Sequence, residues 1–129
     1  RYLLVQELDK DGGKKVLNQP AGHLEPGETL VQAAVREALE ESCWKISIDG
    51  LLGISLFQSS TGHNYLRHTF LATPIELQKE AKLDSDIIST HWLSFEEIES
   101  HFEHLRSPMV MEAIRWHRTG VTYPLEVLK

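Results

Sequence analysis

Glutamates recur at fixed intervals in the stretch GHLEPGETLVQAAVREALEESCW, residues 22–44. A loop containing glycine and proline opens this stretch, and Thr29 is suited to cap a helix that begins there. At about 100° per residue, Glu37, Glu40 and Glu41 fall on one ridge of that helix, away from a stripe of small and apolar residues. Three carboxylates on one ridge have the chemistry to hold a cation.

A charged helix face has a more ordinary explanation, which is a solvated surface with weak ion pairs. For the three glutamates alone that explanation is favoured. The balance changes because the loop adds Gly22, Glu25 and Glu28, and because like charges three and four residues apart repel unless a cation lies among them. Mg²⁺ takes oxygen ligands from carboxylates and substrate phosphates, and it is the natural partner for such a ridge.

The stretch reads Gly22, five residues, Glu28, seven residues, Arg36-Glu37-Ala38, one residue, Glu40-Glu41. This spacing resembles the signature of the Nudix hydrolases, which cleave diphosphate linkages attached to another moiety. One position departs, because the family pattern ends with glycine where this chain has Cys43. Glycine suits a helix end that needs a left-handed residue, so the departure concerns the helix exit more than the chemistry.

The resemblance implies the fold as well. We expect the α/β (α+β) class, as a Nudix-type α/β/α sandwich with a mixed sheet, and a single domain over residues 1–129. The family normally places another strand before the first one here, so we expect that N-terminal strand to be missing from this chain. Its absence would leave a sheet edge exposed.

The resemblance also implies the metal ligands. Glu37, Glu40 and Glu41 would hold or position the ion, with the carbonyl of Gly22 as a further ligand. The implied cofactor is Mg²⁺, with Mn²⁺ as an alternative. The implied reaction is metal-assisted attack of water on a phosphorus atom of a diphosphate.

Arg36 and Glu28 are implied to support the site rather than to react. An arginine fork that bridges Glu28 and Glu40 would hold the loop against the helix and fix the orientation of a ligand. We therefore expect loss of either residue to lower activity indirectly.

The general base is open between Glu37, Glu41 and an acidic residue further along the chain. Nudix enzymes often place an extra acid in the loop before a late strand, and Asp86 is the first candidate here, with Asp84 second. A turn or helix-capping aspartate is an equally good explanation of Asp86.

Four further residues are candidate substrate contacts. His23 lies inside the signature, where it is the histidine best placed to touch a phosphate. Arg67 and Arg106 carry guanidinium groups suited to a bidentate grip on a terminal phosphate, and Tyr123 is the fourth candidate. An exposed arginine without such a role is the commoner case.

The similarity extends past the signature over nearly the whole chain. NQPAGHLE (18–25), LRSPMV (105–110) and YPLEVL (123–128) resemble the NudJ-type bacterial phosphatases, which release phosphate from nucleoside tri- and diphosphates and from thiamine-related pyrophosphates. This implies Mg²⁺-dependent hydrolysis of such linkages to give orthophosphate. Two alternatives stay open, namely another Nudix pyrophosphohydrolase of the 8-oxo-dGTP or ADP-ribose type, and a non-catalytic sensor of Nudix fold that only binds a nucleotide.

Markers of the competing classes are absent from the sequence. ADP-ribose pyrophosphatases tend to carry a proline about fifteen residues beyond the signature, where Ser59 and Ser60 stand. Dinucleoside polyphosphate hydrolases favour a tyrosine slightly further on, where Thr61 and Gly62 stand. A sensor is expected to lose a signature carboxylate, and this chain keeps them all, which favours an enzyme.

The elements that must position these residues follow from hydrophobic periodicity and turn chemistry. The signature helix should pack on the core through the stripe Val31, Ala34, Val35, Ala38, Leu39 and Ser42. Before the signature we expect a strand at 2–8 and a turn that includes Asp11. After it we expect strand at 46–48 and 51–57, broken at Asp49-Gly50, and a hairpin partner at 65–72 after a polar loop. The rest of the chain should form a loop at 76–86, a strand at 90–93, and helices from Ser94 to about 104 and from Ser107-Pro108 to Arg118.

Composition sets the remaining limits. A length of 129 residues with 41% hydrophobic residues suits one domain with one core. The net charge of −6 and the lack of a basic run give no support to a nucleic-acid polymer as partner, so the expected partner is a small nucleotide or pyrophosphate. A single cysteine and no long apolar stretch predict a cytoplasmic protein without a membrane segment. Monomer and homodimer both stay open.

Overall fold

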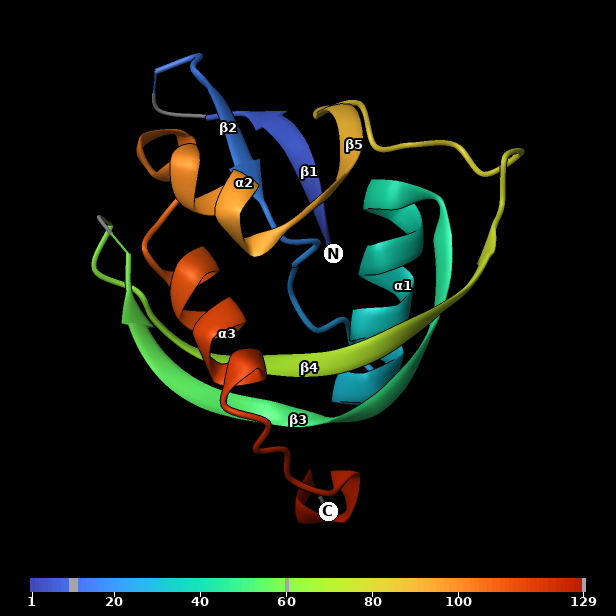
Figure 1. Ribbon diagram of the computed structural model, residues 1–129. Helices are drawn as coiled ribbons and strands as arrows, with labels where there is room; N and C mark the ends of the chain where they lie inside the picture. The colour runs from blue at the N-terminus through green and yellow to red at the C-terminus, as the bar shows by residue number, and fades with distance from the viewer. Residues whose placement is uncertain (10–11, 60, 129) are drawn as a thin grey trace.

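The computed structural model describes residues 1–9, 12–59 and 61–128 (Figure 1). Asp11, in the predicted turn, and Ser60, in the predicted hairpin loop, lie outside these ranges. In chain order the described elements are β1 (Tyr2–Leu8), β2 (Lys15–Asn18), α1 (Leu30–Ser42), β3 (Trp44–Gln58), β4 (Asn64–Leu77), β5 (Ile87–Leu93), α2 (Phe95–Ser100), the 3-10 helix η1 (Phe102–His104), α3 (Met109–Arg118) and the 3-10 helix η2 (Leu125–Leu128).

Strand β1 is the central strand of a three-stranded sheet with the order β2-β1-β5. It has the bounds that the sequence predicts. Leu4 and Val5, whose side chains point to opposite faces of the sheet, are both fully buried. The sheet is therefore covered on both faces at β1, and Figure 1 shows α1 on one side of this strand and α2 and α3 on the other.

Strands β3 and β4 form a long antiparallel hairpin that curves around α1 and α3 (Figure 1). The predicted hairpin is confirmed, but the predicted break at Asp49-Gly50 is wrong, because β3 runs from Trp44 to Gln58 without interruption. The pairing shifts between Ile48 and Gly50, so that a bulge takes up the extra residue. Such bulges bend a strand, and the bend lets the hairpin wrap around the helices.

Strand pairing also moves two predicted boundaries. Strand β4 continues to Leu77, because Leu77 pairs with Trp44 at the start of β3, so the predicted loop at 76–86 begins later. Strand β5 begins at Ile87 rather than Thr90, because its first residues pair with β1. Cross-strand pairing outweighs the polar composition on which these predictions depended.

The α+β fold class is confirmed, whereas the mixed sheet is not. In the described part of the chain the named strands pair only in the antiparallel sense, and parallel pairing is confined to an isolated bridge between Leu17 and Leu105. Two of the three strand pairs join consecutive strands as hairpins, which are antiparallel by geometry. A parallel pair requires a longer crossover connection.

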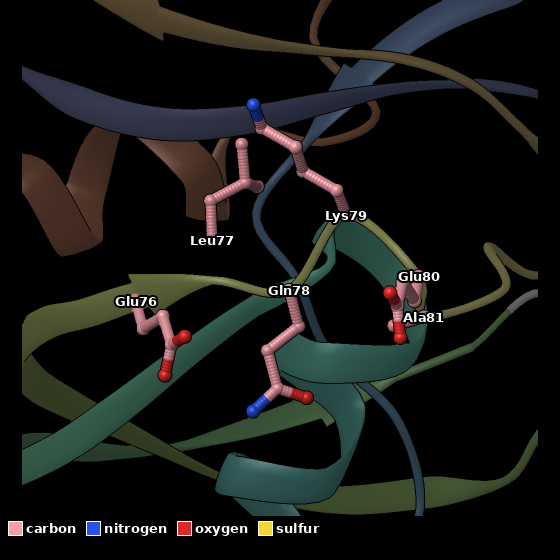
Figure 2. A pocket seen from close by; sticks show the side chains of 6 residues that line it. All are labelled: Glu76, Leu77, Gln78, Lys79, Glu80 and Ala81. Carbon is pink, nitrogen blue, oxygen red and sulfur yellow. The ribbon is translucent and has the colours of Figure 1, made fainter.

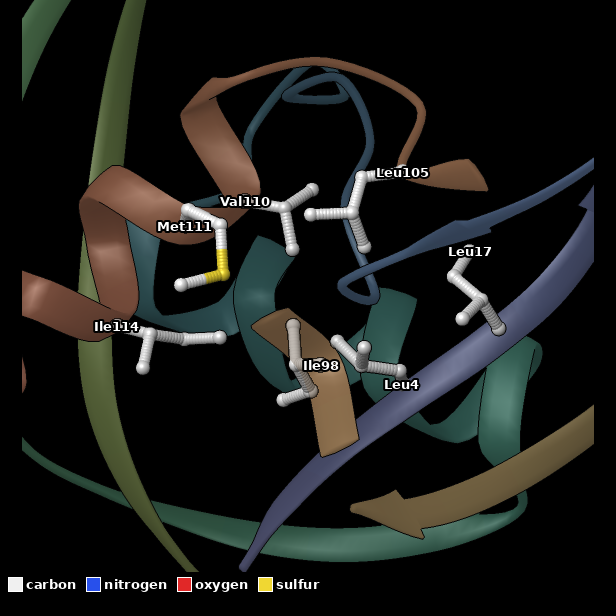
Figure 3. Packing of buried hydrophobic residues seen from close by; sticks show 7 residues of the cluster. All are labelled: Leu4, Leu17, Ile98, Leu105, Val110, Met111 and Ile114. Atoms are coloured by element: carbon white, nitrogen blue, oxygen red, sulfur yellow. The ribbon is translucent and has the colours of Figure 1, made fainter. Parts of the chain in front are cut away.

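The main hydrophobic core lies between the three-stranded sheet and the C-terminal helices (Figure 3). Leu4 of β1 and Ile98 of α2 are fully buried there, as are Val110 and Met111 of α3. The complete cluster is Leu4, Leu17, Ile98, Leu105, Val110, Met111 and Ile114. This core holds β1 and β2 in place, and the loop that leads to α1 follows directly from β2.

Helix α1 starts where the sequence predicts. The Thr29 side chain accepts a hydrogen bond from the Gln32 backbone N–H at 3.1 Å, and the Gln32 side chain accepts one from the Thr29 N–H at 2.9 Å. This reciprocal capping box fixes the first turn. The predicted packing stripe is only partly right. Its members Ala38 and Ser42 are buried, but the other buried residues of the helix, Ala33 and Glu41, lie outside the stripe.

Cys43 ends α1 in the left-handed conformation, with φ 63° and ψ 11°. It adopts the conformation for which the family pattern has glycine, and its N–H donates to the Leu39 carbonyl at 2.9 Å. Its thiol also donates to the carbonyl of Ala81 at 3.1 Å. The exit geometry of the helix is thus kept despite the substitution, at the steric cost that a Cβ carries in this region.

The C-terminal helices largely follow the predicted pattern. The Ser94 capping box is present, but α2 ends at Ser100 and continues as η1 rather than as one helix to residue 104. Helix α3 has Pro108 at its N-cap and Arg118 as its last residue. Among the described residues, no helix has the length and apolar character needed to span a membrane.

Candidate active site

Arg36 is the centre of the signature residues, because its guanidinium group contacts carboxylates of both the loop and α1. Its Nε donates to Glu28 Oε2 at 2.7 Å, and its Nη2 donates to Glu28 Oε1 at 3.0 Å. Its Nη1 donates to Glu37 Oε1 at 2.7 Å and to Glu40 Oε2 at 3.2 Å, and lies 3.6 Å from Glu25 Oε1. The structure thus contains the bridge between Glu28 and Glu40 that the resemblance implies.

These contacts keep the paired groups ionised. The hydrogen bond from Arg36 holds the pKa of Glu28 below its usual value, and the same bond raises the pKa of Arg36. Glu37 and Glu40 share this one cation, so part of the repulsion expected on the ridge is relieved within the chain. The ridge therefore has part of its counter-charge within the chain, because Arg36 reaches both glutamates from the same helix.

Glu41 lies in the opposite situation, since its side chain is buried and has no cationic partner among the described residues. Its carboxylate accepts only long hydrogen bonds, at 3.3 and 3.4 Å, from the backbone N–H of Ala21. The pKa of Glu41 is raised to about 8, chiefly by burial and also by the charges of Glu37, Glu7 and Asp84, while the Ala21 bond opposes the shift. A carboxyl group in these surroundings holds its proton close to neutral pH.

The loop lies against the carboxylate of Glu37. A Cβ at Gly22 would overlap that carboxylate in its present position, so a larger residue would force the Glu37 side chain to move. Ala21 and Gly22 are consecutive, and their main chain contacts Glu41 and Glu37 respectively. The backbone of the loop therefore lies beside two of the predicted metal ligands.

Of the two acids before β5, Asp84 is the one that the structure brings to the signature. Its backbone N–H donates to the Glu40 carbonyl at 3.0 Å, and its charge contributes to the raised pKa of Glu41. Asp86 is exposed, and it has no hydrogen bond or ion pair within the described ranges. The geometry therefore reverses the order of preference that the sequence suggested.

The two predicted arginines lie close together beside the end of β1. Arg106 Nη1 donates to Glu7 Oε1 at 2.8 Å, and Asn18 Nδ2 donates to the same oxygen at 3.2 Å. Arg67 Nη2 donates to Gln19 Oε1 at 3.5 Å. Burial lowers the pKa of Arg67, and the nearby charge of Arg106 lowers it further. Two cationic groups from distant parts of the chain thus share one region.

Sequence reasoning missed Glu7 and Gln19. Glu7 pairs with Arg106 and also acts on Glu41 through its charge, so it links the arginines to the buried carboxylate. Its one sequence signal was a carboxylate within an otherwise largely apolar strand. Gln19 carried no signal of its own, because its role depends on how the loop lies against β4.

The other two predicted substrate contacts, His23 and Tyr123, lie in different parts of the structure. The His23 carbonyl accepts a hydrogen bond from Arg36 Nη2 at 2.9 Å, and its ring packs on Tyr65 with 5.4 Å between ring centroids. Tyr123 exchanges backbone hydrogen bonds of 2.9 and 2.8 Å with Leu51, and its side chain is 50% exposed. In the part of the chain that the structure describes, no contact joins Tyr123 to the signature. The structure brings His23 to the site but not Tyr123.

The predicted metal ligands have the oxygen donors that a hard divalent ion prefers, but their carboxylates point in different directions. Within the described ranges, no three His, Cys, Asp or Glu side chains converge as a metal ion requires. Glu37 and Glu40 turn to Arg36, and Glu41 turns to the backbone of the loop. Carboxylate oxygens are nevertheless the donors that Mg²⁺ prefers, and Glu41 is a buried acid without a counter-ion.

Two cavities lie away from the signature. One of about 430 Å³ is lined by consecutive residues at the end of β4 and after it, Glu76, Leu77, Gln78, Lys79, Glu80 and Ala81 (Figure 2). The other, of about 350 Å³, lies against the three-stranded sheet and includes His91, His101 and His104. No signature carboxylate lines either cavity.

Comparison with known proteins agrees with this arrangement. The family model described as NUDIX domain matches residues 1–114. Phosphatase NudJ of Escherichia coli strain K12 is 38% identical over 128 residues, which cover 99% of this chain and 82% of that protein.

Solved structures show the same relationship. A NUDIX hydrolase from Nitrosomonas europaea superposes with a TM-score of 0.94 at 41% identity, over 98% of this chain and 86% of the other. A UDP-X diphosphatase has a TM-score of 0.70 at 17% identity, over 95% of this chain and 59% of the other, and shares the fold. With the family model, the sequence similarity and the arrangement around Arg36 in agreement, this chain belongs to the Nudix hydrolase family, and within it the chain is similar to the NudJ phosphatases.

Proposed function

We propose that this chain hydrolyses diphosphate linkages in nucleoside tri- and diphosphates or thiamine-related pyrophosphates, releases orthophosphate, and depends on Mg²⁺ or Mn²⁺. Nudix hydrolases generally use divalent metal ions and act on small nucleotide-like substrates. Similarity to a protein named a phosphatase over 99% of this chain supports release of phosphate. The observation that carries the proposal is the placement of Arg106 near Arg67 and in contact with Glu7, whose charge in turn acts on Glu41.

In this proposal the signature glutamates Glu37, Glu40 and Glu41 hold the metal ion, with the carbonyl of Gly22 as a further ligand. The ion supplies charge neutralisation on the phosphate oxygens and lowers the pKa of water in its coordination shell. Glu37 and Glu40 already contact the cationic group of Arg36. A metal ion beside Glu41 would favour its ionised form, because a nearby positive charge lowers the pKa of a carboxyl group.

Arg67 and Arg106 bind the terminal phosphate, for which their planar guanidinium groups offer paired donors. Burial of Arg67 strengthens its interaction with an anion, because water screens the charges less. The general base stays open between Glu37, Glu41, Asp84 and Asp86. Of these, Glu37 and Asp84 lie close enough for their charges to act on the buried Glu41.

The test is a substrate panel with separate detection of orthophosphate and pyrophosphate. Nucleoside triphosphates, nucleoside diphosphates, thiamine pyrophosphate and ADP-ribose are each incubated with Mg²⁺, with Mn²⁺ and with EDTA. We expect orthophosphate release that requires the metal ion. Arg67→Lys keeps the charge but loses the paired donors, and should raise KM for the preferred substrate, whereas Arg115→Lys on the exposed face of α3 should not.

Other outcomes select the alternatives. Release of pyrophosphate, or turnover of ADP-ribose alone, would replace the phosphatase with another Nudix pyrophosphohydrolase. Tight nucleotide binding without turnover in either metal would identify a sensor. A folded protein that neither binds nor cleaves any member of the panel would contradict the proposed substrate class.

A further inference from the structure

Four aromatic rings gather where the tip of the β3–β4 hairpin meets the loop before α1. Tyr65 is at their centre, with ring centroids 5.4 Å from His23, 6.3 Å from Phe57 and 6.4 Å from His63. The Phe57 and Tyr65 rings are stacked, with an interplanar angle of 28°. Phe57 and Tyr65 are each 37% exposed, and His23 and His63 are exposed as well. We call these four residues the ring cluster.

The ring cluster shares one face of the hairpin with the arginine that contacts the loop. Phe57 lies directly opposite Tyr65 in the pairing, and Ser55 lies directly opposite Arg67. Residues two apart on a strand point to the same face, and so do directly opposite partners, so these four side chains share a face. Tyr65 and Arg67 are separated by about 7 Å along the strand.

The loop runs beside β4 in the opposite chain direction. Gln19 contacts Arg67, and four residues later the ring of His23 contacts Tyr65. Gly22, between them, lies against Glu37. Going along the loop from the hairpin tip, the order of groups is therefore aromatic rings, then the Glu37 carboxylate, then Arg67.

The aromatic rings at one end and Arg67 at the other match the parts of one class of molecule. A flat heterocycle joined through a sugar or short linker to a polyphosphate presents a ring at one end and anionic groups at the other. Aromatic side chains bind such rings by stacking, which does not depend on the hydrogen-bonding edge of the base. The ring cluster offers stacking partners with partly exposed faces, and its described contacts are between rings.

We propose that the ring cluster, with Tyr65 at its centre, stacks the aromatic heterocycle of the substrate while Arg67 and Arg106 hold its phosphates. This inference rests on the proposed function, and it names the substrate class as heterocycle-bearing di- and triphosphates with little preference among bases. It also gives His23 a role different from phosphate contact, because its ring is engaged with Tyr65.

A cross-strand aromatic pair also stabilises a hairpin without any ligand. The test must therefore separate stacking from folding. Tyr65→Ala removes the central ring, Tyr65→Leu removes the ring but keeps apolar bulk, and Tyr65→Phe keeps the ring and removes only the hydroxyl. Inorganic tripolyphosphate, which carries phosphates but no ring, serves as a competitor against a nucleoside triphosphate.

We expect Tyr65→Ala and Tyr65→Leu to raise KM for the nucleoside triphosphate about 10-fold, with kcat within about twofold, because stacking contributes to binding and not to the bond-breaking step. The inhibition constant of tripolyphosphate should stay unchanged in all variants. Tyr65→Phe should restore the wild-type KM. If Tyr65→Ala fails to fold, Tyr65→Leu alone carries the comparison.

An unchanged nucleotide KM in Tyr65→Leu, or an equal change for nucleotide and tripolyphosphate, would overturn the proposal. Failure of the proposed function is seen separately, as absence of turnover in the wild-type protein. In that case calorimetric binding of a nucleoside diphosphate in Mg²⁺ replaces KM. About 10-fold weaker binding to Tyr65→Leu would then support the ring cluster, and equal or absent binding would overturn it.

Discussion

The two sides of α1 hold carboxylates in contrasting states, although Glu40 and Glu41 are neighbours in the sequence. On one side Arg36 binds Glu28, Glu37 and Glu40, so their negative charge is shared with a cation. On the other side Glu41 is buried without such a partner among the described residues, and its pKa is raised to about 8. One helix therefore offers glutamates paired with an arginine and a single glutamate whose charge depends on what binds beside it.

This contrast explains why a run of glutamates is not redundant. The paired side fixes geometry, since Arg36 connects the loop to the helix and also holds the carbonyl of His23. On the unpaired side the ionised form of Glu41 has no positive group beside it among the described residues, and a bound cation would stabilise that form.

Loss of the buried carboxylate should have the largest effect. Glu41→Gln keeps the shape and the acceptor for Ala21 but removes the charge that a bound cation would induce. We expect kcat for phosphate release to fall by about 10²–10³, the scale for loss of one preorganised charged group. Steady-state kinetics at saturating Mg²⁺ measures this, and a fall of less than threefold would show that Glu41 is not required.

Loss of the shared cation should have a smaller, indirect effect. Arg36→Lys keeps one positive charge, but an ammonium group does not donate to the loop and to two helix glutamates in the same planar arrangement. We expect activity to fall about 10- to 100-fold, as is typical for residues that orient metal ligands. The affinity for Mn²⁺, followed by electron paramagnetic resonance, should weaken in parallel. Unchanged affinity together with lost activity would place Arg36 in the chemistry instead.

The two aspartates before β5 form a matched pair. Asp84→Asn removes a charge that acts on Glu41, and we expect about a 10-fold loss of kcat, at the lower end for a residue next to the metal ligands. Asp86→Asn should have the smaller effect, because its side chain makes no contact with the signature within the described ranges. Measurement of kcat for both variants decides the order, and the reverse order would restore Asp86 as the candidate base.

Stability of the metal-free protein should depend on pH through Glu41. A glutamate has a pKa near 4.3 in the unfolded chain, and that of Glu41 is about 8 in the folded state. Between these values the folded protein binds a proton that the unfolded chain has lost, so the free energy of unfolding falls as pH rises from about 4.3 to 8. Urea unfolding in EDTA at pH 5 and pH 8 should show a smaller decline for Glu41→Gln. Equal declines would mean that Glu41 titrates normally.

The sequence was sufficient for the features that depend on local spacing. The signature helix and its Thr29 cap follow from residues close together in the chain, and the family resemblance implied the pairing of Arg36 with Glu28 and the α+β class. Burial of Glu41 did not follow, because helical periodicity places it with the exposed acids while the loop at Ala21 covers it. Glu7 and Gln19 were missed for the same reason, since their partners are remote in sequence. The continuity of β3 depends on bulges in its pairing with β4, and no local sequence pattern predicts those bulges.

The ion pair between Glu7 and Arg106 joins residues 99 positions apart, and the Gln19–Arg67 bond spans 48. Contacts of such separation require closure of long loops and tend to be late events in folding. A nascent chain that has emerged only through β5 thus contains α1 and Arg67 but lacks Arg106. The ion pair between Glu7 and Arg106 therefore forms only after the segment beyond η1 has emerged.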